Sequence, residues 1–185
     1  MTDQDPRPLA GEPLAIDLLN TRWTHGADLR DLLSSTEGLA GWLASDTVVR
    51  ELRGHEVRAD RGTLDALLQV RDALAAVIDD PAGPAARHAL NAVLAHGRVR
   101  FALAADGPVH EVETDSPRWL PAWAAADNYL RLLGERPDRI RRCAGPDCVL
   151  HFYDTSKNGT RRWCSMAGCG NRAKASRHYA RHKRD

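Results

Sequence analysis

Four cysteines, all in the last quarter of this 185-residue chain, constrain its fold more than any other feature. Four residues separate Cys143 from Cys148, fifteen separate Cys148 from Cys164, and four separate Cys164 from Cys169. Two pairs at this spacing predict two tight turns, or knuckles, that bring four thiolates around one zinc ion in a closed, structural site. A redox-active pair or inert buried thiols are the alternatives.

The surroundings of these cysteines favour a metal over disulfides. A secretion signal begins with basic residues followed by an apolar run. Residues 1–6 are acidic instead, so they do not resemble such a signal. No apolar run approaches the roughly 18 residues that a membrane helix needs. We therefore expect a cytoplasmic protein with no membrane partner, in which a reducing environment keeps the thiols free for zinc.

Charge divides the chain into two parts. Residues 1–135 contain 13 Lys and Arg against 21 Asp and Glu, a net charge of −8, whereas residues 136–185 contain 13 against 4, a net charge of +9. We therefore predict an acidic body over residues 1–136 and a basic zinc module over residues 137–185. A basic module attached to an acidic body is typical of proteins that bind nucleic acid. The alternative is a basic tail that docks on the acidic body.

The body is predicted to be mainly helical with one β-hairpin. Apolar residues recur at spacings of three, four and seven from Thr63 to Ile78, which indicates an amphipathic helix. From Arg98 to Val112 the apolar period changes to two around Asp106-Gly107, which indicates a hairpin. Ser34 and Glu37 resemble a capping box that opens a helix. The helices are expected at residues 14–19, 29–33, 34–43, 63–78, 84–96 and 117–133.

The zinc module is expected to be an α+β, treble-clef-like unit of two knuckles, a hairpin and a basic helix. Residues 149–153 and 160–163 flank Lys157-Asn158-Gly159, so a small hairpin is expected to join the knuckles. Phe152, Tyr153 and Trp163 are predicted to fill its core, with base stacking as the alternative.

A basic helix is predicted after Cys169. At 100° per residue, Lys174, Arg177, Arg181 and Arg184 share one stripe. Ala175, Tyr179 and His182 lie on the other side of the helix. Aligned cations repel one another, and a row of phosphates would relieve that repulsion. A solvated charged helix is the alternative.

These residues also carry a family resemblance. The run from Cys143 to Lys174, above all the Cys-Gly-Asn-Arg tetrapeptide at residues 169–172, resembles the bacterial CGNR zinc finger. Residues 11–21 and the predicted helices after them are similar to the ABATE domain, which precedes this finger in a family named putative stress-induced transcription regulators. The resemblance implies a DNA-binding regulator in a bacterial stress response.

Several side chains are candidates for contact with nucleic acid. Asn171 could cap the basic helix or bind phosphate, and Arg172 could pair with Asp154 or bind phosphate. The full set of candidates is Arg161, Arg162, Asn171, Arg172, Lys174, Arg177, Arg181 and Arg184.

Three classes of function compete. The first is a transcription regulator whose finger binds DNA and whose body senses a small-molecule effector, through a pocket containing Asn20, Arg22 and His25, or forms a homodimer. The second is an RNA-binding or protein-docking module. The third, an enzyme built around Asp17, Thr21 and the pocket residues, is not expected, because no nucleophile and base are paired there. A zinc deaminase is also disfavoured, because four thiolates leave no place for a water molecule.

Overall fold

The protein is described by a computed structural model that covers residues 5–182, with side chains as far as Ser176. Arg184 therefore lies outside the described residues, as do the side chains of Arg177, Tyr179 and Arg181. The helices are α1 Leu14–Leu19, α2 Thr36–Leu43, α3 Asp46–Glu51, α4 Arg61–Asp79, α5 Pro84–Leu94, α6 Leu120–Glu135 and α7 Asn171–His182. The strands are β1 Arg22–His25, β2 Asp28–Asp31, β3 Gly97–Ala104, β4 Gly107–Thr114, β5 Ile140–Arg142 and β6 His151–Tyr153.

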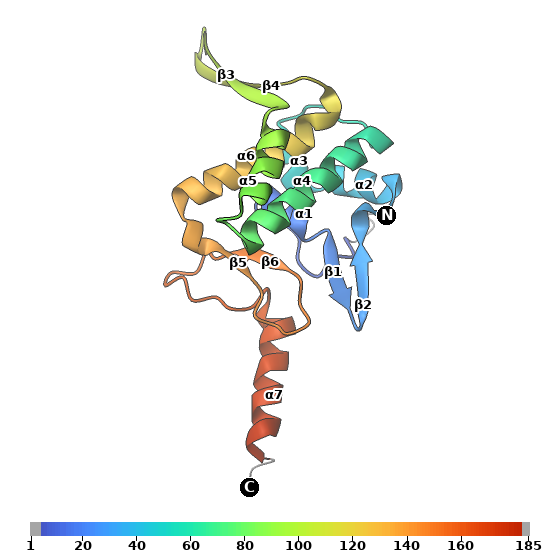
Figure 1. Ribbon diagram of the computed structural model, residues 1–185, viewed down its shortest axis with the longest axis vertical. Helices are drawn as coiled ribbons and strands as arrows, with labels where there is room; N and C mark the ends of the chain where they lie inside the picture. Colours follow the sequence, from blue (N-terminus) through green and yellow to red (C-terminus); the bar gives the residue numbers. More distant parts are fainter. Residues whose placement is uncertain (1–4, 183–185) are drawn as a thin grey trace.

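The body is a bundle of helices built around α1. All six residues of α1 are buried, and it packs against α4 and α6, which also contact each other. Helix α4 begins at the N-cap Asp60, whose carboxylate accepts a 2.8 Å hydrogen bond from the Thr63 amide, and its apolar face enters the core as its periodicity predicts. The expected helical body followed by a small cysteine module is confirmed (Figure 1).

The predicted hairpin of the body is also confirmed. Strands β3 and β4 pair antiparallel, with Val99 opposite Val112. In Figure 1 this hairpin extends from one end of the helical bundle and α7 extends from the other. The cysteine module lies between the bundle and α7.

The helix expected at residues 29–33 is wrong, because β1 and β2 form a hairpin there. Gly26 makes the turn at a φ of +64°, a conformation that glycine adopts without strain. The carboxylate of Asp31 binds the guanidinium of Arg71 through two 2.7 Å contacts, which fixes the end of the hairpin on α4. A contact across forty residues thus overrides three leucines at helical spacing.

Two smaller predictions also need correction. The cap of α2 is Ser35 rather than Ser34, because the Ser35 hydroxyl accepts the hydrogen bond from Gly38 while Ser34 ends a short 3₁₀ turn, η1 Leu32–Ser34. The hairpin expected between the knuckles does not form, because β6 pairs with β5 instead and residues 160–163 are a loop.

Candidate metal centre and nucleic-acid interface

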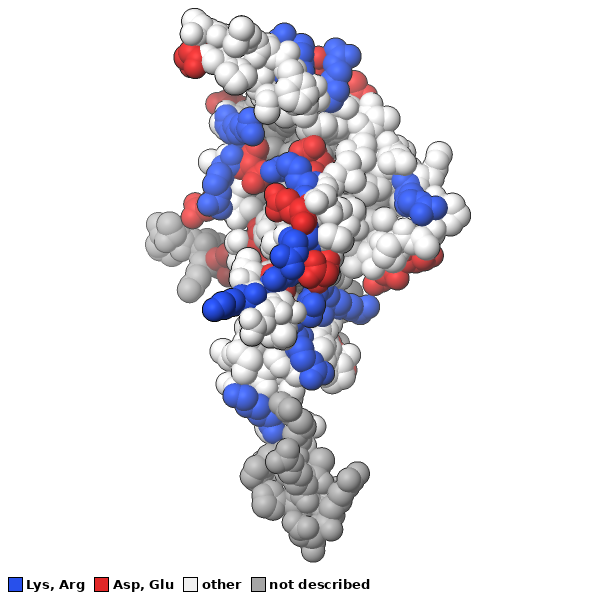
Figure 2. Space-filling view, turned by 90° about the vertical axis from the view of Figure 1, so that its left-hand side faces the viewer, with Lys and Arg blue, Asp and Glu red and all other residues white. Residues whose placement is uncertain are grey.

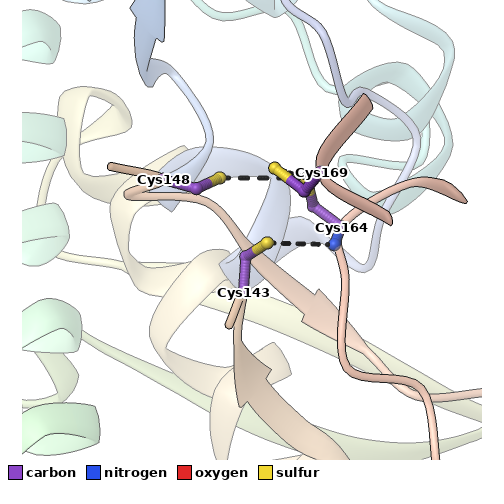
Figure 3. A group of neighbouring side chains, drawn as sticks. All are labelled: Cys143, Cys148, Cys164 and Cys169. Atoms are coloured by element: carbon purple, nitrogen blue, oxygen red, sulfur yellow. Dashed lines mark hydrogen bonds between the residues drawn. The ribbon is translucent and has the colours of Figure 1, made fainter. Parts of the chain in front are cut away.

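The four cysteines meet at one point of the module. Cys143 follows β5, Cys148 lies just before β6, Cys164 ends a loop, and Cys169 belongs to a π-helical turn, η4 Met166–Gly170. Their side chains point toward one another in Figure 3, and all four sulfur atoms lie within 4.8 Å of one another. The predicted gathering of the four thiols is confirmed.

The spacing of the sulfurs fits zinc. Four zinc–sulfur bonds of about 2.3 Å in a tetrahedron place neighbouring sulfurs about 3.8 Å apart. The Sγ of Cys164 lies 3.8 Å from that of Cys148 and 3.6 Å from that of Cys169. The four cysteines therefore form a site for one structural zinc ion, and four thiolate ligands would leave no position open for a water molecule.

The four thiols influence one another's ionisation. A hydrogen bond from Cys164 lowers the pKa of Cys148 to about 5, despite its burial, and the same bond raises the pKa of Cys164. Burial raises the pKa of Cys169. Adjacent thiolates repel one another, so all four ionise together only when a metal ion supplies the opposing charge.

Two donors around the centre stabilise the thiolates. The backbone amide of Cys164 lies 3.3 Å from the Sγ of Cys143, and the Nη2 of Arg172 lies 3.0 Å from the Sγ of Cys169. Arg172 therefore donates to a metal ligand, whereas the carboxylate of Asp154 accepts hydrogen bonds from the Ser156 and Arg161 amides. Of the two roles considered for Arg172, the pair with Asp154 is not observed.

Asn171 does not cap α7, which is one of the two roles considered for it. It is the first residue of that helix, and its side-chain Nδ2 donates back to the Ala167 carbonyl at 3.4 Å. The cap before it is Ser165, whose hydroxyl accepts a hydrogen bond from the Gly168 amide and so holds the η4 turn. Because η4 is inserted between Ser165 and α7, the capping position moves away from Asn171.

Two comparisons with family models place this architecture. Residues 139–182 match the CGNR zinc finger. Residues 12–136, more than half of the chain, match ABATE, described as "Putative stress-induced transcription regulator". The chain belongs to the ABATE family. A comparison with curated proteins gave no match. Among the described residues, no helix is long and apolar enough to cross a membrane.

The ABATE region holds the CGNR finger along the free edge of β6. The Asn20 side chain donates to the His151 carbonyl and accepts from the His151 amide, both at 2.9 Å. Glu12 accepts a 2.9 Å hydrogen bond from the Tyr153 amide. These two side chains supply the partners that a third strand would give to β6. We call Glu12 and Asn20 the clamp.

The core of the finger includes a residue of the ABATE region. Trp23, on β1, is buried in one apolar cluster with the four cysteines, Leu150 and Phe152, and Trp163 packs against this cluster. Tyr153 instead packs against the core of the body. Trp23 lies outside the helices predicted from the sequence, and no local pattern connects it with cysteines more than one hundred residues away.

The three residues expected to form an effector pocket differ in their surroundings. Asn20 is fully buried in the clamp, and Arg22 pairs with Asp31 at 3.0 Å and lines a hollow of about 220 Å³ beside α4. His25 is exposed at the end of β1. Neither Asn20 nor His25 lines the hollow that Arg22 lines.

The residues of the enzyme alternative also serve inside the fold. The Asp17 carboxylate is fully buried and accepts hydrogen bonds from Arg7 at 2.7 Å and from the Trp42 indole at 2.9 Å. The Thr21 hydroxyl accepts a 2.8 Å hydrogen bond from Arg71. Buried polar groups require such partners, so these hydrogen bonds give both residues a structural role.

The cationic candidates divide into inward and outward side chains. The Arg161 guanidinium lies over the Phe152 ring at 4.3 Å and donates to the carbonyls of Trp163 and Cys164. It therefore stabilises the loop that carries Cys164. Arg162, Arg172 and Lys174 are exposed. On the face shown in Figure 2, Lys and Arg prevail over Asp and Glu next to the beginning of α7.

Proposed function

We propose that this ABATE protein is a transcription regulator whose CGNR finger binds DNA through α7. The zinc ion holds Cys169, and through it the base of the helix, in place. The phosphate contacts come from Arg162, Arg172 and Lys174 and, further along the helix, from Arg177 and Arg181. Arg161 is left out, because its guanidinium donates to two carbonyls of the finger and lies over the Phe152 ring. Arg172 is kept, because it is exposed and, among the described residues, only the contact of its Nη2 with the Cys169 Sγ ties it to the finger.

One observation carries the proposal: α7 extends away from the acidic body. The sequence has no Asp or Glu between Asp154 and Asp185, and nine Lys and Arg lie in that interval. A helix of this width fits the major groove, and Lys and Arg along it would neutralise phosphates and release their counterions. A tail that docks on the acidic body would lie against it, whereas α7 extends from the body in Figure 1.

The ABATE region acts, in this proposal, as the regulatory part. We propose residues 1–136 as a body that senses a small molecule or forms a homodimer, residues 137–185 as the nucleic-acid module, and the cytoplasm as the place of action. We propose no catalytic activity, because Asp17, Asn20 and Thr21, three side chains of the enzyme alternative, take part in internal hydrogen bonds.

A competition experiment tests this function. Filter binding of the zinc-loaded protein to labelled duplex DNA, with unlabelled duplex, structured RNA or heparin as competitor, ranks the partners by affinity. The proposal expects duplex DNA to compete best and the affinity to fall steeply with salt. Stronger competition by RNA would favour the RNA-binding alternative, and no binding to either nucleic acid would favour a protein-docking module.

A further inference from the structure

A cavity of about 550 Å³ lies where the β1–β2 hairpin of the ABATE region faces the CGNR finger. Thr24 and Gly26, at the end of the β1–β2 hairpin, line one side, and Trp163, Arg172 and Ala173 are among the finger residues that line it. Thr24 also joins the two sides directly, because its hydroxyl donates to the Asp147 carbonyl at 2.8 Å. A cavity of this volume suits a small organic ligand better than a single ion.

The lining combines cationic and aromatic groups. Two arginines, Arg162 and Arg172, line the cavity. Among the described residues, Asp147 is the one acidic residue that lines it. Trp163 is half-buried, and the guanidinium of Arg162 lies 5.3 Å from the centre of its ring. Guanidinium groups bind phosphate through paired N–H donors, and indole rings stack on nucleobases.

We infer that this cavity binds one nucleotide unit, with its base against Trp163 and its phosphate on Arg162 and Arg172. This inference deepens the proposed function and rests on it for the nucleic-acid source. The unit has two sources, a free nucleotide or an unpaired nucleotide within bound DNA. Bases inside a regular duplex are stacked and cannot enter, since extrusion costs a few kcal/mol. The finger therefore prefers DNA that already contains an unpaired nucleotide.

The test uses two alanines on the same helix. Ala173 lines the cavity, whereas Ala175 is exposed and does not line it, so Ala173→Leu fills the cavity and Ala175→Leu is the matched control. Neither substitution changes a charge or a metal ligand. One zinc per chain in each variant establishes that the finger is intact.

The readouts are fluorescence anisotropy with a 20-base-pair duplex, with and without one unpaired nucleotide, and tryptophan quenching by adenosine monophosphate. We expect the unpaired nucleotide to raise the affinity of the wild type and of Ala175→Leu about 10-fold, within the range for stacking on one aromatic side chain. Ala173→Leu should lose this gain while keeping its affinity for the regular duplex. Quenching by the monophosphate in the wild type, absent in Ala173→Leu, would identify the free nucleotide as a ligand.

A second pair covers the case in which Ala173→Leu does not fold. Trp163→Phe should keep most of the gain and Trp163→Leu should lose it. Equal affinity for the two duplexes together with no response to the monophosphate would overturn the inference. Binding to the regular duplex would still stand in that case, so the outcome differs from failure of the proposed function, in which neither duplex binds but the monophosphate can still quench.

Discussion

At the scale of single residues, Asn20 connects the two regions of the chain. It is fully buried, and its side chain satisfies both backbone groups of His151. Asn20→Ala leaves a buried N–H and C=O without partners, and each such group costs about 1–3 kcal/mol. We expect the free energy of unfolding in urea to fall by at least about 2 kcal/mol.

The matched control for this prediction is Asn158→Ala, at an exposed turn of the finger. It should change the unfolding free energy by less than about 0.5 kcal/mol. Equal effects of the two substitutions would show that the clamp does not hold the finger to the body.

The sequence identifies the zinc ligands but not the clamp. Cysteine spacing is local information, and all four residues meet as their spacing predicts. Asn20 resembles a residue at the end of a helix, and its partner His151 lies 131 positions away. No periodicity encodes such a pair, so the sequence alone could not predict that Asn20 belongs to the clamp.

At the scale of secondary-structure elements, the glycines of α2 allow a matched comparison. A Cβ at position 38 would lie 1.8 Å from the backbone oxygen of Leu32, whereas one at position 41 would meet nothing within 4 Å. Gly38→Ala should therefore destabilise the protein by at least about 2 kcal/mol, because η1 and α2 must separate. Gly41→Ala should stabilise it by about 0.5–1 kcal/mol. Thermal unfolding followed by circular dichroism distinguishes them, and a harmless Gly38→Ala would contradict the close packing of these elements.

The contact between Asp31 of the β1–β2 hairpin and Arg71 of α4 predicts that the stability of the fold depends on pH. Burial raises the pKa of Asp31, but its hydrogen bonds with Arg71 and Arg22 outweigh this effect and hold the pKa below its usual value. A carboxylate with a lowered pKa stabilises the fold above its unfolded pKa of about 3.9, and this contribution is lost as the pH falls through the folded value.

Asp31→Asn should therefore cost about 3 kcal/mol at pH 7, because Arg71 is left as a buried cation without its partner. The difference from the wild type should shrink as the pH falls below about 4. Urea unfolding at several pH values measures it, and loss of zinc at low pH affects both proteins alike. A difference independent of pH would contradict the ion pair.

Contacts between residues far apart in the sequence also explain which elements the sequence could predict. Helices α4 and α5 follow from long periodic patterns, because each buries a face that its own residues define. The β3–β4 hairpin follows from its apolar period of two and from its own turn, although its strands stay partly or fully exposed. Strands β2 and β6 are four and three residues long, and their conformation depends on Arg71 for β2 and on β5 for β6. Short elements fixed by distant partners leave no period to detect.

At the scale of the whole molecule, zinc should hold the finger together without holding the body. The apolar core of the bundle contains none of the cysteines, whereas the cluster around the metal includes Trp23 and Phe152. Removal of one zinc per chain by a chelator should make four thiols reactive and shift tryptophan emission to longer wavelength. The helical circular dichroism of the bundle should persist, and its collapse would contradict two separable cores.

The central claim is that the exposed basic helix of the CGNR finger contacts phosphates. The direct measurement is the slope of log affinity for duplex DNA against log salt concentration, for the wild type and for the triple variant Lys174→Ala, Arg177→Ala, Arg181→Ala. Each lost phosphate contact removes about 0.9 from the slope, so the triple variant should flatten it by roughly 2–3 while keeping one zinc per chain. An unchanged slope, accompanied by a lower melting temperature of the whole chain, would contradict the account, because it would mean that these cations dock on the acidic body.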